Sequence, residues 1–302
     1  MSGLVERRGF TVAEGRDAGL SRRQLYGPGV QRSFRGVRTI DVDIEDHRVR
    51  CRAYAALRRP GHIFSHHSAA ALHGFPLRWA VQSRDVHVAV FAPLKPPRMD
   101  GVVGHELRGA GHRIVTLDDM QVVAAEDAWA QLSGVLPIDD LVAIGDWLIT
   151  GDEPYSGTAP SHTRDQLESA IRHHGRRPGV RRLREAFELV RYGPLSPQES
   201  RLRLELVRAG LPEPSLNHDV HDRERRIAMV DLAYPDHRLA IEYLGDHHRT
   251  DADTYREDIY RRERQAAAGW DVVFLTVDDL AGPTPRAPLI VRRAYARASR
   301  RP

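Results

Sequence analysis

The feature that most constrains the fold of this 302-residue chain is a pair of short apolar segments, each interrupted by one acidic residue. Asp231 lies in the first segment and Glu242 in the second, and the Pro-Asp-His-Arg sequence at 235–238 between them is typical of a turn. A two-residue loop at Asp236-His237 predicts an antiparallel pair of strands. In that register Asp231 stands directly opposite Glu242, on one face of the sheet.

Opposed carboxylates in a partly buried sheet are unfavourable unless something neutralises their charge. A divalent cation does so, and oxygen ligands without a thiol favour Mg²⁺, with Mn²⁺ as a second choice. The alternative is that each acid is exposed at a sheet edge or paired with an arginine. The candidate partners are Arg225, Arg226 and Arg261.

The two acidic strands belong to a longer series of elements predicted over 196–277. The predicted elements are a helix at 196–209, strands at 217–222, 226–234 and 238–244, a helix at 252–268 and an apolar strand at 270–277. The order is α-β-β-β-α-β. Ser196 and Glu199 form a capping-box pattern at the start of the first helix, which explains Glu199 on its own. Glu199 is also a candidate to face the metal.

These motifs carry a resemblance to a known family. They are Ser-Pro-Gln-Glu at 196–199, the acidic strands with their flanks at 229–235 and 240–249, and the segments 258–262 and 269–273. Together they resemble actinobacterial proteins related to very-short-patch-repair endonucleases, within the PD-(D/E)XK nuclease superfamily. The resemblance implies a Mg²⁺-dependent phosphodiesterase core, with Asp231 and Glu242 as metal ligands and Glu199 as a helix-borne acid.

Further catalytic groups are expected near this core. His248 follows the second acidic strand and would assist as a general base, since imidazole titrates near neutral pH; a polar loop without a catalytic role is the alternative. Arg249, Arg261 and Arg262 would contact phosphates. Together these residues predict a metal-dependent DNA endonuclease that cleaves phosphodiester bonds.

One position departs from the family pattern. The superfamily places a lysine two residues after the glutamate, where this chain has Leu244. Leucine cannot polarise water or stabilise a phosphorane. The alternative function is therefore a non-catalytic DNA-binding regulator, similar to an antitoxin, with a degenerate nuclease domain. A third hypothesis is a structural partner in a defence complex, with a toxin or another defence protein as its partner.

The excess of arginine over acidic residues lies in the N-terminal part of the chain. Residues 1–40 hold eight arginines and three acids, and short helices around Gly19 are followed by a basic hairpin. This pattern predicts a winged helix-turn-helix at 1–47, in which Arg22, Arg23 and Arg35 bind DNA. A small helical hairpin with solvated arginines is the alternative. The segment from Phe10 to Phe75 is similar to AbiEi-type antitoxin proteins.

The overall prediction is an α/β (mixed α+β) chain with four parts. Besides the winged helix, these are a mixed α/β middle region at 48–150, a linker and helix at 151–195, and the nuclease-like domain at 196–302. Helices are predicted at 65–73, 118–133 and 138–149, and strands at 85–91, 102–107 and 113–117. For the histidines near the first helix, His62, His66, His67 and His73, packing or polar contacts are favoured over zinc.

The apolar segments and the cysteine content indicate in which cellular compartment the protein is expected. No run approaches the roughly 20 apolar residues of a membrane span, and the first residues lack the apolar stretch of a signal peptide. Cys51 is the only cysteine, which excludes intrachain disulfides and cysteine-rich zinc clusters. We therefore expect a cytoplasmic protein. Its expected partner is DNA, and no association with a membrane is expected.

Overall fold

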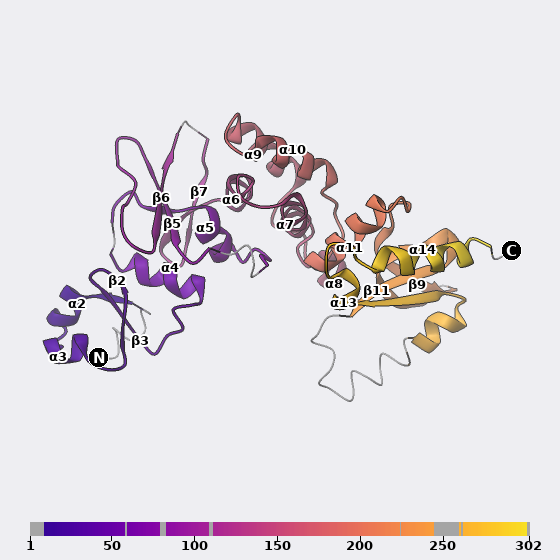
Figure 1. The fold of residues 1–302 in the computed structure, drawn as a ribbon, viewed down its shortest axis with the longest axis horizontal. Helices are drawn as coiled ribbons and strands as arrows, with labels where there is room; N and C mark the ends of the chain where they lie inside the picture. Colours follow the sequence, from indigo (N-terminus) through magenta and orange to yellow (C-terminus); the bar gives the residue numbers. More distant parts are fainter. Residues whose placement is uncertain are drawn as a thin grey trace. The chain divides into compact units, whose positions relative to one another are not determined.

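The chain is mixed α+β and divides into two compact units (Figure 1). The first unit comprises Met1–Leu141 and Arg164–Glu185, and the second comprises Val142–Thr163 and Ala186–Pro302. The computed structural model describes residues 9–57, 59–78, 83–108, 111–223, 225–244, 260 and 262–300. In this described part of the chain, no helix is long and apolar enough to cross a membrane.

The first unit begins with two short helices and a small sheet. The elements are β1 (Phe10–Thr11), α2 (Val12–Asp17), α3 (Arg22–Tyr26), β2 (Val30–Phe34) and β3 (Val37–Ile40), and the strand order is β1-β3-β2. Thr11 and Glu14 form a capping box on α2, and Ser21 caps α3. Gly19, between the helices, has φ +84°, a conformation that favours glycine. The predicted helix pair and hairpin are both present.

A five-stranded sheet forms the rest of this unit. Its strands are β4 (Ile63–Phe64), β5 (Val86–Phe91), β6 (Val102–Leu107), β7 (Ile114–Leu117) and β8 (Met120–Val123), in the order β6-β5-β4-β8-β7. The helices are α4 (His47–Ala55), α5 (His66–His73), α6 (Ala125–Leu132) and α9 (Arg164–His174). Trp129 of α6 is fully buried, and its indole N–H donates to the Leu141 carbonyl at 2.8 Å.

The helix predicted at 118–133 is wrong over its first part. Residues 118–119 form a tight turn, and Met120–Val123 is strand β8; the helix begins only at Ala125. Asp118 and Asp119 have φ angles of +46° and +63°. Aspartate tolerates this left-handed conformation, which two-residue hairpin turns require. The hairpin therefore overrides the helical pattern.

Two helices run from one unit into the other. These are α7 (Ile138–Thr150) and α10 (Val180–Leu189), so the segment predicted as linker at 151–195 is divided between the units. The second unit also contains α8 (Glu153–Ser156), α11 (Pro197–Arg208), β9 (Ser215–Asp222), β10 (Arg225–Tyr234), the 3-10 turn η2 (Pro235–His237), β11 (Leu239–Leu244), β12 (Asp271–Thr276), α13 (Val277–Leu280) and α14 (Ala287–Ala298).

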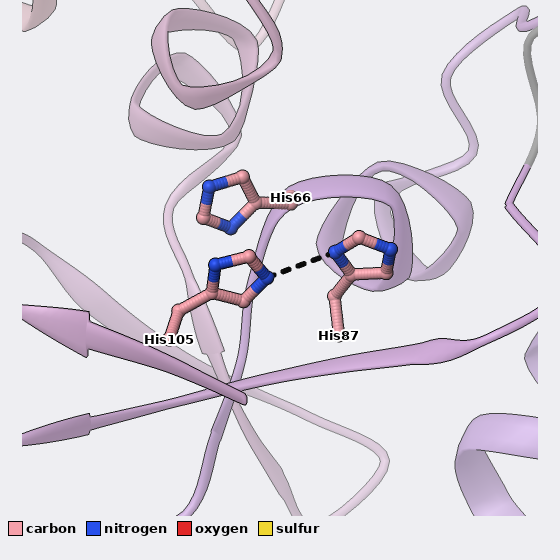
Figure 2. Close-up of side chains that lie close together, drawn as sticks. All are labelled: His66, His87 and His105. Atoms are coloured by element: carbon pink, nitrogen blue, oxygen red, sulfur yellow. Dashed lines mark hydrogen bonds between the residues drawn. The ribbon is translucent and has the colours of Figure 1, made fainter. Parts of the chain in front are cut away.

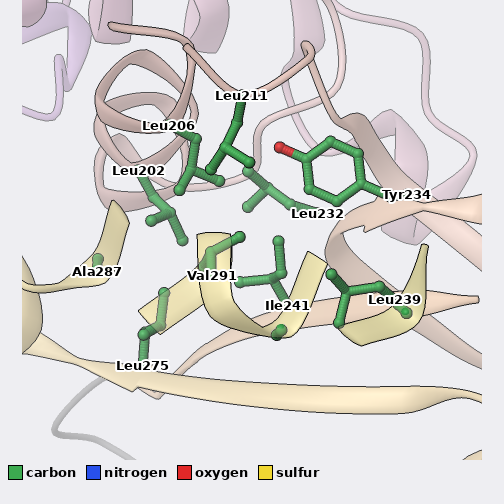
Figure 3. Close-up of a cluster of buried hydrophobic side chains, with 12 residues drawn as sticks. Leu202, Leu206, Leu211, Leu232, Tyr234, Leu239, Ile241, Leu275, Ala287 and Val291 are labelled. Atoms are coloured by element: carbon green, nitrogen blue, oxygen red, sulfur yellow. The ribbon is translucent and has the colours of Figure 1, made fainter. Parts of the chain in front are cut away.

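The sheet of the second unit has the order β12-β11-β10-β9, with β11 parallel to β12 and antiparallel to β10. A helical segment at 262–267 precedes β12, so α11 to β12 follow the predicted α-β-β-β-α-β order. Helices α11 and α14 pack on one face of the sheet through a buried apolar cluster (Figure 3). A second, smaller cluster, which includes Val220, Val230 and Ala240, lies on the sheet as well.

A buried ionic network ties α7 to α11. The Arg203 guanidinium lies 3.4 Å from Asp146 Oδ2 and 2.8 Å from Glu213 Oε1, and both Arg203 and Asp146 side chains are 1% exposed. Asp146 also accepts hydrogen bonds from the Ser200 hydroxyl and the Arg191 backbone N–H. Burial raises the pKa of Asp146 to about 6, and the positive charge of Arg203 opposes that shift. The network therefore holds a buried aspartate in a satisfied position.

Replacement of Arg203 tests this network. We expect Arg203→Ala to lower the free energy of unfolding by about 3–5 kcal/mol, because it removes the charged partner of a buried carboxylate. Urea denaturation measures the change. Arg208→Ala is the matched control, since its pair with Glu205 is exposed and worth less than about 1 kcal/mol. Equal losses in the two variants would contradict the role given to Arg203.

Candidate functional site

The strand pairing that was predicted around Asp231 and Glu242 is present. Strands β10 and β11 pair Leu232 with Ile241, and Tyr234 with Leu239, in the expected register. The connection is the 3-10 turn η2, closed by a hydrogen bond from the Arg238 N–H to the Pro235 carbonyl at 2.9 Å. When this register is continued by one residue on each strand, Asp231 stands opposite Glu242.

The backbone ladder ends one pair before the acids. Its last pair is Leu232 with Ile241, and beyond it the side chain of Asp231 reaches across to β11. Asp231 Oδ2 accepts a hydrogen bond from the Tyr243 backbone N–H at 2.7 Å. The half-buried Asp231 carboxylate thus lies beside the backbone of the residue that follows Glu242.

Glu242 is almost completely buried, with 3% of its surface exposed. Its Oε1 accepts a hydrogen bond from the side-chain amide of Gln265 at 2.9 Å, and Gln265 is fully buried. One turn earlier, the Arg262 guanidinium lies 3.9 Å from the ring centre of Phe274, which pairs with Glu242 across β11 and β12. The helical segment at 262–267 therefore covers the sheet at Glu242.

Gln265 supplies a further oxygen at this place. Its Oε1 is buried and has no hydrogen-bond partner within the described residues. An unsatisfied buried acceptor normally costs about 1–3 kcal/mol, and amide oxygens are among the ligands of hard divalent cations. Beside the buried Glu242 carboxylate, Gln265 therefore contributes an amide oxygen that no described residue satisfies.

Glu199 is placed differently. As expected, the Ser196 hydroxyl caps α11 by accepting from the Glu199 N–H at 3.2 Å. The Glu199 carboxylate, however, accepts from the Leu195 N–H at 2.9 Å and from the Asn217 amide at 3.4 Å. Burial raises the pKa of Glu199, and these hydrogen bonds oppose the shift. Glu199 does not form one close group with Asp231 and Glu242, judged over the residues that the structure describes.

Some of the other residues predicted for this site lie outside the described part of the chain, whereas Leu244 lies within it. His248, Arg249 and Arg261 lie outside the described residues. Leu244, at the position where the family pattern has lysine, is half-buried at the end of β11 and pairs with Thr276. It contributes no positive charge.

The predicted DNA-contacting arginines lie on the surface of the first unit. Arg22 and Arg23 are exposed at the start of α3, and Arg35 is exposed in the turn between β2 and β3. Nearby, two further guanidinium groups lie close to the ring of Tyr26. The carbon of the Arg38 guanidinium is 4.5 Å from the centre of the Tyr26 ring, and that of Arg32 is 5.3 Å away. Arg38 is only 4% exposed and donates to the Leu25 and Val37 carbonyls. The basic surface around the helix pair therefore comes from the exposed side chains of Arg22, Arg23, Arg32 and Arg35.

The sequence did not predict a histidine cluster in the first unit. His66 at the start of α5, His87 on β5 and His105 on β6 each offer a ring nitrogen, and these three atoms all lie within 4.8 Å of one another (Figure 2). It is the one group of three or more His, Cys, Asp or Glu residues this close in the described ranges. By contrast, His62 contacts Tyr54 Oη and His73 contacts the Val123 carbonyl, in line with the polar contacts favoured for them.

The histidine cluster lines a cavity of about 360 Å³. Burial lowers the pKa of His66 to about 2 and that of His87 to about 3, and neighbouring histidines contribute to both shifts. The same cavity is bordered by Asp127, whose pKa burial raises to about 6. Three further histidines, His67, His112 and His174, complete its polar lining together with Glu106, Gln131 and Arg177.

Comparison with known proteins yields two relatives without a stated activity. No family model matches the chain. Two curated proteins named as uncharacterized, from Mycobacterium tuberculosis strains CDC 1551 and H37Rv, are each 32% identical to it over 136 residues. The matched segment is 45% of this chain and 50% of each relative, so the chain spans about half the length of the curated relatives it matches.

Proposed function

We propose that the second unit is the phosphodiesterase domain of a metal-dependent DNA endonuclease, related to very-short-patch-repair endonucleases. The observation that carries the proposal is the register of β10 and β11, which places Asp231 opposite Glu242 one pair beyond the last ladder pair and brings the Asp231 carboxylate to the Tyr243 N–H. The resemblance of the motifs to PD-(D/E)XK nucleases supports it, as does the α-β-β-β-α-β order. Cytoplasmic DNA is the proposed substrate.

The residues around the pair fit a hard divalent cation. Asp231 and Glu242 would hold Mg²⁺ or Mn²⁺, with Gln265 Oε1 as a further oxygen within the buried site. When bound, the ion would polarise a phosphodiester oxygen and lower the pKa of a water molecule. The N–H of Tyr243 orients the Asp231 carboxylate, and the amide of Gln265 orients that of Glu242.

Arginine and histidine side chains are the remaining groups of the proposed nuclease. Arg262 is exposed beside Phe274 and would contact a phosphate of the substrate. From the sequence alone, Arg249 and Arg261 are assigned the same role, and His248 would accept the proton of the attacking water. Exposed Arg22, Arg23 and Arg35 would hold the DNA backbone at the winged helix.

Leu244 favours a second candidate function. Without a lysine at that position, the carboxylates could keep a metal while hydrolysis is lost. The protein would then be a DNA-binding regulator, similar to an antitoxin, that uses the same basic surface. A toxin or another defence protein is the partner that this second function implies.

Plasmid cleavage separates these two functions. With Mg²⁺ or Mn²⁺, we expect nicking of supercoiled plasmid by the full chain, and a loss of more than about 100-fold in Asp231→Asn, because a direct metal ligand is removed. Asp236→Asn, an exposed residue in the adjoining turn, is the matched control and should retain the rate. No metal-dependent nicking, or equal rates in both variants, would defeat the nuclease proposal.

DNA affinity tests the basic surface in either case. We expect the Arg22→Ala/Arg23→Ala double variant to reduce the slope of log affinity against log salt concentration by about 1.8, since each phosphate contact contributes about 0.9. Fluorescence anisotropy with a labelled duplex measures it. Arg293→Ala/Arg297→Ala removes the same charge from exposed positions of α14 and should leave the slope unchanged. Equal slopes in both double variants would exclude the winged helix as the DNA contact.

A further inference from the structure

We propose that His66, His87 and His105 form a binding site for a zinc-type divalent cation in the first unit, separate from the carboxylate pair. The three side chains come from α5, β5 and β6, and their ring nitrogens lie within 4.8 Å of one another. Imidazole nitrogens suit Zn²⁺ and its neighbours Co²⁺ and Ni²⁺, whereas Mg²⁺ prefers oxygen ligands. The donor set therefore selects a different class of ion from that of the second unit.

The backbone places two of these histidines as neighbours on one sheet face. Strands β5 and β6 are parallel and pair His87 with Val103 and Ala89 with His105, so the two histidines occupy diagonal positions. Side chains two residues apart in register share a face of the sheet. Nδ1 of His87 and Nε2 of His105 are hydrogen-bonded at 2.9 Å, so these two nitrogens face each other (Figure 2).

Hydrogen bonds with neighbouring side chains fix the positions of His87 and His66. Nε2 of His87, the ring nitrogen that does not contact His105, lies 3.0 Å from the Ser83 hydroxyl. The backbone N–H of His87 donates to the Ser68 hydroxyl at 2.7 Å. His66 is fixed through its backbone N–H, which donates to Gln131 Oε1 at 3.0 Å. Metal-binding histidines usually have their second ring nitrogen held in this manner, which fixes the tautomer and the ring orientation.

The separations between the nitrogens are close to those that a tetrahedral site needs. Zn–N bonds of about 2.0–2.1 Å at tetrahedral angles place ligand nitrogens about 3.3 Å apart. The present range, from 2.9 Å to at most 4.8 Å, requires only small side-chain movements. The rings of His66 and His105 are stacked with centres 3.8 Å apart, so at least one of the two rings must turn before both nitrogens face one ion.

The surroundings favour an open site. The three histidines line the cavity of about 360 Å³, which has room for water or a small ligand beside them. Three protein ligands with a free fourth position are typical of zinc sites that bind water or substrate, whereas structural sites use four protein ligands.

Calorimetric titration of the full chain, without a histidine tag, tests the site directly. We expect one Zn²⁺ per chain and at least about 100-fold weaker binding in His105→Phe, which keeps a ring but removes the ligand nitrogens. His173→Phe is the matched control, because His173 is exposed on α9 and belongs to no such group. Glu242→Gln should bind Zn²⁺ as tightly as the wild type, which separates this site from the carboxylate pair.

Co²⁺ gives a second readout that does not depend on the amount of heat released. The wild type should show the strong visible absorption of tetrahedral Co²⁺, and His87→Phe should lose it while keeping its unfolding transition in chelator. A wild-type chain that binds neither Zn²⁺ nor Co²⁺ would overturn the proposal. So would a His105→Phe or His87→Phe variant that binds as the wild type does.

Discussion

The pairing of β10 with β11 is the constraint on which the proposed carboxylate site depends. The 3-10 turn at Pro235–His237 fixes the register, and the apolar residues Leu232 and Ile241 bury themselves against α11 and α14 in that register only. A slip by one residue would turn these side chains to the opposite face, and the acids with them. The free energy that packs this core therefore also positions Asp231 and Glu242.

The two units offer different donor atoms. The second unit gathers carboxylate and amide oxygens at the end of a ladder, and the first gathers imidazole nitrogens beside a cavity. Hard cations prefer the former and borderline transition metals the latter. In both places the ligand side chains are held by hydrogen bonds with neighbours, such as the Gln265 amide and the Ser83 hydroxyl. One chain thus carries two distinct kinds of candidate metal site.

The carboxylate pair was predictable because its geometry is local. A short turn links the two strands, so sequence distance alone determines which residues face each other. The histidine triad depends instead on the pairing of β5 with β6, whose register no short turn sets, and on where α5 begins. One histidine on each of the predicted strands at 85–91 and 102–107, His87 and His105, was the available signal. The helix predicted at 118–133 failed for a different reason, because the helical pattern was extended over a local two-residue turn at Asp118-Asp119 and the strand that follows it.

The central claim is that Asp231 and Glu242 together bind a divalent cation. A crystal of the full chain soaked in Mn²⁺ tests it most directly, because Mn²⁺ gives anomalous scattering that locates the ion. The account predicts an anomalous peak bonded to a carboxylate oxygen of each residue. It is contradicted if no peak appears there while Asp231 still accepts from the Tyr243 N–H and Glu242 from Gln265.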